Sequence, residues 1–408
     1  MSPRPPGTRD GSGQPGSQSA LRLSNQERII RTLLDLGPLT QAELSRQTGL
    51  STATVSNIVR ALLDRELVTT SPVTSSGRRA VAVSVSGNGA VAVGIDFGRR
   101  HTRVVVASLA YELIAEEAIE TDLEQDARGR LDAAATLLAH ALAKADRPRA
   151  SVLGVGVGIP GSIDLRTGTA ADSSILPEWD GVSEDAIASR LKLPIYLDND
   201  ANLGALAEVT WGPHTGTANL VFVKIATGIG AGLILNGTQH RGSIGVTGEL
   251  GHTPIHEHGL LCRCGNRGCL ETVASTSMML ELLRRSSVPS TTTGDIVRNG
   301  LAADRATLRV IDDAGLAIGR SLATIANVVN PEKFIIGGPL AGLGEVFLAP
   351  IRQGFERYAI PVVADATILA MSSLGDKAEA LGAASLVLQQ PGSHTFAMGS
   401  LSSFALTS

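Results

Sequence analysis

Cysteine is scarce in this 408-residue sequence, and its three copies lie within eight residues of one another. Three cysteines cannot all pair with one another, and no apolar leader opens the sequence, so we expect a cytoplasmic protein without a disulfide framework. Runs of eighteen apolar residues are also absent, so we expect no membrane-spanning helix. These absences favour a globular protein that is not attached to a membrane.

Aromatic residues make up only 3% of the chain, whereas glycine occurs 45 times. This composition favours an α/β protein with many tight turns, and the length allows two or three domains. Residues 1–20 are rich in proline, glycine and serine, which predicts a disordered arm. Residues 389–408 are predicted to form a flexible tail.

Lysine is rare and unevenly placed, because none of the five lysines lies in the first 86 residues. That segment carries ten arginines and six acidic residues, although the net charge of the whole chain is −4. A basic N-terminal module on an acidic body indicates nucleic acid as a partner of the N-terminal end alone.

Residues 21–86 carry the pattern of a winged helix-turn-helix. Ser24 with Glu27, and Thr40 with Glu43, each form an S/T-x-x-E capping box that predicts the start of a helix. Ser51 is the expected cap of a third, longer helix. Two β-type runs then flank a basic turn at residues 75–79, which predicts the hairpin of the wing.

The third helix and the wing supply the candidate contacts to double-stranded DNA. Short polar groups and an arginine on the outward face of the helix are able to reach bases and phosphates in a major groove. The alternative is a three-helix unit that docks onto another protein. The DNA-contact candidates are Thr52, Thr54, Ser56, Asn57, Arg60, Arg78 and Arg79.

Residues 91–388 show buried strands that end in glycine-rich or acidic turns. Two α/β halves of this kind predict an actin-like, ribonuclease-H-like body of two lobes with a ligand between them. The segments that carry this pattern are 91–98, 152–161, 194–202, 220–232 and 334–339.

A C-x-C-x4-C cluster, Cys262, Cys264 and Cys269, follows His252 by ten residues. Three thiolates and one imidazole suit a closed, tetrahedral zinc site. His256 and His258 lie nearby, so the spacing leaves the nitrogen ligand open. Inert buried thiols are the alternative to a metal site.

The stretch G-E-L-G-H, followed by C-x-C-G-x-x-G-C-L-E, resembles the ROK family of repressors, open reading frames and sugar kinases. The chain resembles the regulator subclass, in which a winged helix precedes the sugar-kinase-like body. The resemblance implies that His252, Cys262, Cys264 and Cys269 bind structural zinc. It also implies a sugar site that contains Gly161, Asn199, Asp200, Glu249, His252 and Glu271.

The first phosphate loop departs from the D-x-G-G-T-K pattern of the family's kinases. The chain has Arg99 and Arg100 in place of the second glycine and the threonine, so we expect no ATP cofactor. Ile175 stands where an asparagine would contact the sugar. In kinase members the residue matching Asp200 is the general base, so Asp200 is the catalytic candidate if the protein is an enzyme.

These features favour a sugar-responsive transcription regulator that is not an enzyme. We expect a homodimer or homotetramer that represses carbohydrate genes at the nucleoid, with sugar bound between the lobes. An ATP-dependent hexose or aminosugar kinase with an attached DNA-binding module is the first alternative. A dimerisation platform that binds nothing is the second.

Overall fold

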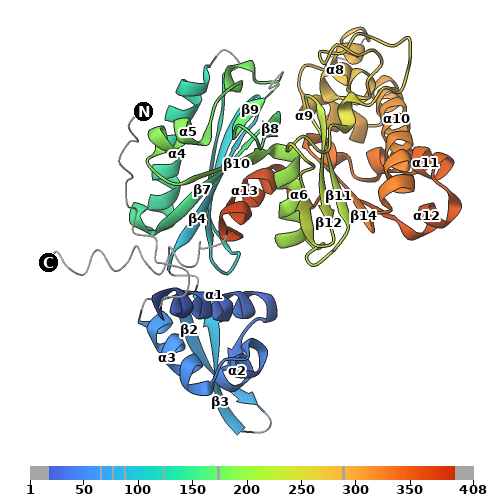
Figure 1. Cartoon of the computed structure of the whole chain (residues 1–408). Helices are drawn as coiled ribbons and strands as arrows, with labels where there is room; N and C mark the ends of the chain where they lie inside the picture. Colours follow the sequence, from blue (N-terminus) through green and yellow to red (C-terminus); the bar gives the residue numbers. More distant parts are fainter. Residues whose placement is uncertain are drawn as a thin grey trace, which may run out of the picture. The chain divides into compact units, whose positions relative to one another are not determined.

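The computed structural model of the chain describes residues 18–64, 67–75, 78–86, 89–122, 125–171, 175–286 and 290–390 (Figure 1). Residues 1–17 of the predicted arm and 391–408 of the predicted tail lie outside the described residues, whereas residues 18–20, which were assigned to the arm, begin the first helix. The chain divides into two compact units, the first of residues up to Ala90 and the second of most residues from Val91 to Gln389. Within the described ranges, no helix is long and apolar enough to cross a membrane.

The first unit is a winged helix-turn-helix, as predicted. Its three-stranded sheet has the order β1-β3-β2, and the antiparallel β2–β3 hairpin forms the wing. The apolar face of each helix packs into one core, which includes Ile29, Val55 and Leu62. The elements are α1 (Gln18–Leu36), β1 (Leu39–Thr40), α2 (Gln41–Thr48), α3 (Thr52–Leu63), β2 (Val68–Ser75) and β3 (Arg78–Val85).

Two of the three predicted helix starts are confirmed, and one is wrong. Thr40 and Glu43 form the complete capping box of α2, and Ser51 caps α3 by accepting from the backbone N–H of Thr54. Ser24, however, lies inside α1, which begins at Gln18. No glycine or proline interrupts this stretch, so the helix continues past a serine that would also suit its first position.

The second unit begins with a lobe built on a five-stranded sheet of order β10-β7-β4-β5-β6. Strands β4, β7 and β10 are parallel and buried, whereas β5 and β6 form an antiparallel hairpin. The elements of lobe 1 are β4 (Val91–Phe97), β5 (His101–Ser108), β6 (Leu113–Glu120), α4 (Ala127–Lys144), β7 (Val152–Ile159), β8 (Ser162–Asp164), β9 (Thr169–Ala171), α5 (Glu184–Leu191) and β10 (Ile195–Asn199).

Lobe 2 repeats this sheet, with the order β13-β12-β11-β14-β15. In both lobes the first strand is central, the second and third form a hairpin on one side, and the fourth and fifth lie parallel on the other. Its elements are α6 (Asp200–Thr210), β11 (Leu220–Ile225), β12 (Ile229–Leu235), β13 (Thr238–His240), α7 (Glu271–Ala274), α8 (Thr276–Arg284), α9 (Thr293–Leu301), α10 (Arg305–Val329), β14 (Lys333–Gly337), α11 (Glu345–Tyr358), α12 (Pro361–Ala366), β15 (Ile368–Met371) and α13 (Ala378–Leu388).

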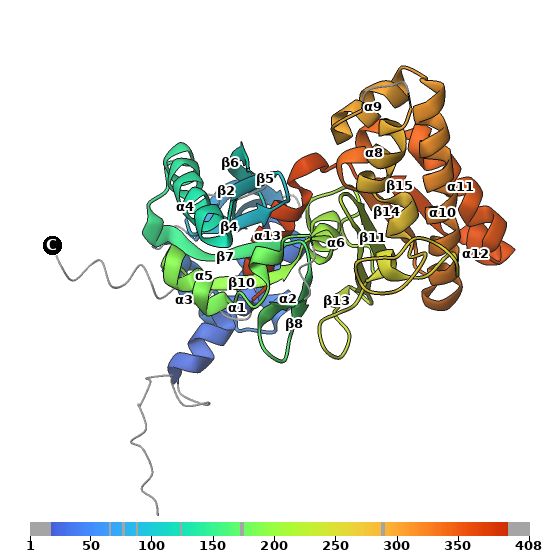
Figure 2. The same cartoon turned by 90° about the horizontal axis from the view of Figure 1, so that it is seen from above.

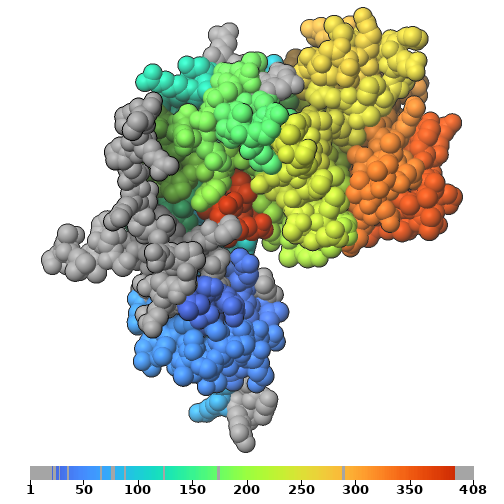
Figure 3. Space-filling view, viewed as in Figure 1, coloured from blue at the N-terminus to red at the C-terminus, as the bar shows by residue number. Residues whose placement is uncertain are grey.

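Two helices, α6 and α13, join the lobes at their centre. Helix α6 follows the last strand of lobe 1 and packs on β11 and β12, while α13 follows the last strand of lobe 2 and packs on β4 and β7. Both views of the ribbon show these helices side by side between the sheets (Figures 1 and 2). In the space-filling view, α13 is the red patch between the green and yellow-green surfaces of the body (Figure 3).

Glycine makes this central packing close. A Cβ atom at Gly94 in β4 would lie 1.9 Å from the carbonyl oxygen of Ala380, and one at Gly156 in β7 would lie equally close to that of Ala383. Helix α13 therefore lies directly on the backbone of the lobe 1 sheet. This packing fixes the strand ends that border the space between the lobes.

Candidate functional site

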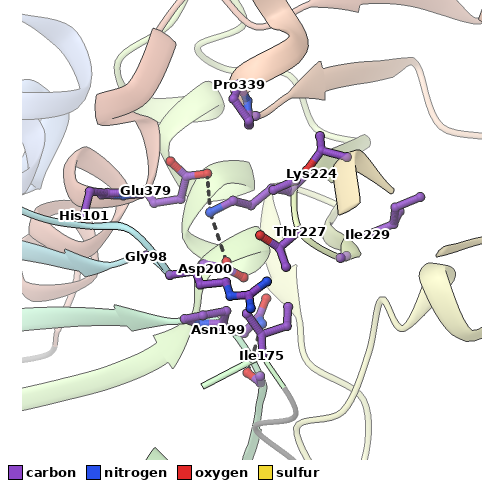
Figure 4. A pocket seen from close by; sticks show the side chains of 18 of the residues that line it. Gly98, His101, Ile175, Asn199, Asp200, Lys224, Thr227, Ile229, Pro339 and Glu379 are labelled. Carbon is purple, nitrogen blue, oxygen red and sulfur yellow. Dashed lines mark hydrogen bonds and ion pairs between the residues drawn. The ribbon is translucent and has the colours of Figure 1, made fainter. Parts of the chain in front are cut away.

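A cavity of about 570 Å³ lies between the two lobes of the body, large enough for a small organic ligand. Its walls are turns at the ends of the central strands: the β4–β5 turn, the β11–β12 turn, and the turn after β14. Figure 4 shows that side chains of both lobes point into it. This position agrees with the prediction of a ligand between the lobes.

Five of the six predicted sugar-site residues line the cavity: Gly161, Asn199, Asp200, Glu249 and His252. The Asn199 side chain donates to the carbonyl oxygen of Gly161 (2.9 Å), and its own oxygen caps α6. Asn199 therefore caps α6 and also forms part of the cavity wall. The Ser162 hydroxyl donates to a carboxylate oxygen of Glu249 (2.7 Å), which holds Glu249 in position.

Glu271, the sixth residue, is not in the cavity wall. It is 7% exposed, with one oxygen 3.0 Å from the sulfur of Cys262 and the other 2.5 Å from Nη2 of Arg263. Arg263 lines the cavity where the sequence analysis expected Glu271. No sequence pattern singles out Arg263, because it occupies the variable position between Cys262 and Cys264 of the metal-site motif.

A buried lysine ties the two joining helices together. Nζ of Lys224, at the end of β11, lies 2.9 Å from a carboxylate oxygen of Asp200 in α6 and 2.8 Å from one of Glu379 in α13 (Figure 4). Burial alone would lower the pKa of Lys224, but Asp200, Glu379 and Asp96 raise it well above its ordinary value. Burial in turn raises the pKa of Glu379, against the attraction of Lys224.

His101 fills the space beside the β4–β5 turn. Its Nε2 forms a 2.6 Å hydrogen bond with Asp96, which is fully buried, and a Cβ atom at Gly98 would lie 2.0 Å from the ring. Burial lowers the pKa of His101, but the bond to Asp96 outweighs it, and the net shift is upward. For Asp96, burial raises the pKa, but Lys224 and His101 lower it overall.

The backbone of the same turn is held from behind by a buried arginine. Arg130 in α4 donates to the carbonyl oxygens of Gly98 (3.0 Å) and Arg99 (3.2 Å), so the turn has a fixed shape. Arg99 and Arg100 are exposed at the cavity wall. Lys224, His101 and Arg130 were all missed by the sequence analysis. Only Lys224 left a local signal, as a lone lysine in an apolar strand.

The four predicted metal ligands come together. Ligand atoms of His252, Cys262, Cys264 and Cys269 all lie within 4.8 Å of one another. The sulfurs of Cys264 and Cys269 are 3.7 Å apart, and Nδ1 of His252 is 3.4 Å from the sulfur of Cys262. Tetrahedral zinc geometry requires about 3.8 Å and about 3.6 Å for such pairs, so the donor set fits zinc.

His252 joins this cluster to the cavity. It belongs to a short 3-10 turn (Leu250–His252), with Nδ1 on the side of Cys262 and Nε2 3.9 Å from a carboxylate oxygen of Glu249. His256 and His258, the other candidates, are not in the group of ligand atoms among the described residues. A metal held by the cluster would therefore fix the orientation of an imidazole that lines the cavity.

The predicted DNA-contact residues lie on α3 and the wing of the first unit. Thr52, Asn57 and Arg60 are exposed on α3, and Thr54 and Ser56 are partly exposed. Thr54 is also within 2.8 Å of the capping hydroxyl of Ser51. Arg79 is exposed on β3; the side chain of Arg78 and the wing tip lie outside the described residues.

Comparison with known proteins gives two family matches. Residues 92–390 match the ROK family, and residues 24–80 match the MarR family. A putative xylose repressor of Caldicellulosiruptor is 29% identical over 91% of this chain and 97% of its own length. A glucokinase of Halalkalibacterium halodurans is 32% identical over 74% of this chain and 96% of its own length.

A solved structure is similar over nearly the whole chain. The crystal structure of a ROK family transcriptional regulator, a homologue of the Escherichia coli Mlc protein, superposes with a TM-score of 0.75. It is 26% identical and covers 94% of this chain and 98% of its own. One polypeptide thus contains segments that match both families, and it also contains the cavity and the Cys/His cluster.

Proposed function

Because the chain belongs to the ROK family, we propose that it is a sugar-responsive, DNA-binding transcriptional repressor of carbohydrate metabolism genes. The observation that carries this proposal is the extent of the similarity. The match to a putative xylose repressor covers 91% of the chain, whereas the match to the glucokinase covers 74%. A winged helix-turn-helix is a motif that reads DNA, and it has no part in phosphate transfer.

In this proposal the sugar binds at the end of the cavity formed by Gly161, Asn199, Asp200, Glu249 and His252. Carboxylates accept strong, charge-assisted hydrogen bonds from sugar hydroxyls. Glu249 is suited to this role because its carboxylate lines the cavity and is held by Ser162. Asp200 serves as a hydroxyl acceptor.

The same proposal assigns the first unit to an operator. Helix α3 enters the major groove of DNA, with Thr52, Thr54, Ser56, Asn57 and Arg60 facing bases and phosphates, and Arg78 and Arg79 of the wing contact the backbone or minor groove. Such a protein acts in the cytoplasm, at the nucleoid. A palindromic operator requires two copies, so we propose a homodimer or a homotetramer.

Zinc held by His252, Cys262, Cys264 and Cys269 is the proposed cofactor. Four protein ligands leave no open position, so the role of the ion is structural. When bound, it supplies a fixed point for the loop that carries Glu249 and His252. Sugar binding next to this loop shifts the balance between arrangements of the two lobes, and operator affinity changes with it.

Kinase activity is the alternative, and the open β11–β12 hairpin and the glucokinase relative favour it. The contacts of the site argue against it. Arg99 and Arg100 are exposed at the cavity wall and His101 fills the space beside Gly98, in the loop where the kinases of the family carry glycine and threonine for the phosphates. An ADP-release assay with hexoses and aminosugars separates the two, because only a kinase shows turnover that Asp200→Asn abolishes.

The direct test is an operator selected from random DNA with the purified, zinc-loaded protein. A panel of monosaccharides, sugar acids and sugar phosphates is then titrated while operator affinity is followed by fluorescence anisotropy. We expect one sugar class to weaken binding at least tenfold. Unchanged operator affinity with the whole panel would show that the protein is not sugar-responsive.

A further inference from the structure

Among the described residues of the body, the chain crosses between the two lobes at two places, and an acidic residue lies at the start of the helix at each crossing. The first crossing joins β10 to α6, which begins at Asp200, and the second joins β15 to α13, whose first turn contains Glu379. Helix α6 packs on the sheet of lobe 2, and α13 packs on the sheet of lobe 1. A change in the arrangement of the lobes must therefore alter the backbone at one or both crossings.

Lys224 contacts both of these acidic residues from a third position in the chain. It lies in β11 of lobe 2, and its Nζ is 2.9 Å from a carboxylate oxygen of Asp200 and 2.8 Å from one of Glu379 (Figure 4). All three side chains are at most 13% exposed, so solvent screens these two ion pairs only weakly. One ammonium group therefore joins the two crossings to each other and to lobe 2.

Asp200 is also a predicted acceptor of the sugar. It lines the cavity, and the carboxylate oxygen that is not paired with Lys224 accepts from the backbone N–H of Ala201 (2.8 Å). A carboxylate offers about four lone-pair positions, so a sugar hydroxyl is able to donate to Asp200 beside both of these donors. The added hydroxyl shares the negative charge of Asp200, which weakens its attraction for Lys224.

From this arrangement we propose that Lys224 is a positioning residue, and that it couples sugar binding to the arrangement of the two lobes. Without sugar, Lys224 holds Asp200 and Glu379 together and maintains the arrangement that binds the operator. A sugar hydroxyl at Asp200 loosens this hold, so the sugar favours a second arrangement. The inference rests on the proposed function and names the side chain through which the sugar acts.

Glu379→Gln tests the proposal, because it keeps the size of the side chain and removes its charge from the pair with Lys224. The full-length, zinc-loaded variant and wild type are compared for affinity to the operator selected with the wild type. Without sugar, we expect the variant to bind this operator roughly fivefold more weakly, the difference between a charge-assisted and a neutral hydrogen bond.

Glucose, xylose and N-acetylglucosamine, together with the rest of the panel, are then titrated into both proteins by calorimetry. Because coupling between two ligands is reciprocal, a variant released from the operator-binding arrangement should bind the responsive sugar as tightly as the wild type or more tightly. That sugar should also weaken operator binding by the variant less than it does in the wild type. A damaged fold would instead weaken both ligands.

Glu178→Gln is the matched control, because Glu178 lies 3.2 Å from the buried Arg130 and this pair belongs to lobe 1 alone. It should leave operator affinity and sugar response unchanged. If Glu379→Gln binds the operator as the wild type does, or loses affinity for operator and sugar alike, Lys224 only stabilises the body, and the inference fails while the proposed function stands. If no sugar of the panel changes operator binding by the wild type, the proposed function fails and the inference fails with it.

Discussion

The first hairpin of each lobe has the same place in the strand order, but the side chains at its turn differ. In lobe 1, the β4–β5 turn is filled by the imidazole of His101, which is bonded to Asp96. In lobe 2, the β11–β12 turn is lined by glycine and faces the cavity, with Lys224 at the strand before it. The two lobes therefore share a backbone arrangement but differ in the chemistry of their turns, because the side chains at each turn determine which ligand can approach.

The difference extends to the residues behind each turn. Lobe 1 holds its turn with the buried Arg130, whereas lobe 2 places the Cys/His cluster beside the cavity. The cavity-lining groups whose position depends on a metal ion therefore belong to lobe 2. The β4–β5 turn of lobe 1, which His101 fills, provides a fixed part of the cavity wall.

Removal of the metal should have the largest effect on ligand binding, and this effect should arise in lobe 2, because lobe 1 has no counterpart of the cluster among the described residues. We predict that Cys264→Ser reduces bound zinc from about one ion per chain to nearly none, and that sugar affinity falls with it. Metal content by mass spectrometry and sugar titration measure the two effects. His258→Ala is the control, and retention of the metal by Cys264→Ser would contradict the assignment.

Loss of the buried lysine should have the next largest effect. Lys224→Met leaves the buried Glu379 and the partly buried Asp200 without their cation, which should cost about 3–5 kcal/mol in the free energy of unfolding. Lys144→Met removes an exposed ion pair with Glu117 and should cost about 1 kcal/mol or less. Urea unfolding of both variants makes the comparison. Equal losses would show that the network around Lys224 does not stabilise the body.

The hydrogen bond between His101 and Asp96 at the β4–β5 turn predicts that the stability of the protein depends on pH. The pKa of His101 is raised, so its contribution to stability is full below the ordinary value of about 6.5 and is lost as the pH rises through the folded value. The pKa of Asp96 is lowered, so the pair also weakens in acid below about pH 4.

We therefore predict that the free energy of unfolding falls by about 1 kcal/mol or less between pH 6 and 9. This fall should be absent in His101→Gln. The side chain of His101 is 40% exposed, which keeps the effect small. Thermal unfolding at a series of pH values measures it, with the surface variant His140→Gln as control. A wild-type profile identical to that of His101→Gln would show that the bond to Asp96 adds no stability.

The smallest effect is expected outside both lobes. Arg60→Ala should weaken operator binding and reduce the slope of log affinity against log salt by about one unit, if Arg60 contacts a phosphate. Arg128→Ala, an exposed substitution in α4, is the control. A salt slope equal to that of the wild type would remove Arg60 from the phosphate contacts.

Local sequence patterns predicted the fold well. The capping residues Thr40 and Ser51 mark helix starts because their hydrogen bonds join neighbours in the sequence. The buried strands before Gly98 and Gly161 were also found, since apolar runs that end at glycine are visible locally. The predicted start of α1 at Ser24 was wrong because no glycine or proline ends the helix before that residue, and the helix begins at Gln18.

The candidate site was only partly predictable. The metal cluster and Glu249 follow from a compact motif, and the structure brings the cluster together. The pairing of Lys224 with Glu379 joins residues far apart in the sequence, so no local pattern reveals it. The exchange of Glu271 for Arg263 in the wall depends on which way each side chain points, and spacing alone does not determine that.

We propose that a sugar held between the lobes controls the DNA-binding unit. The most direct measurement is the operator affinity of the wild type and of Glu249→Ala, each with and without the sugar found in the panel. We predict that the sugar weakens wild-type operator binding at least tenfold and leaves that of Glu249→Ala nearly unchanged. An equal response of both proteins, or none in the wild type, would contradict the account.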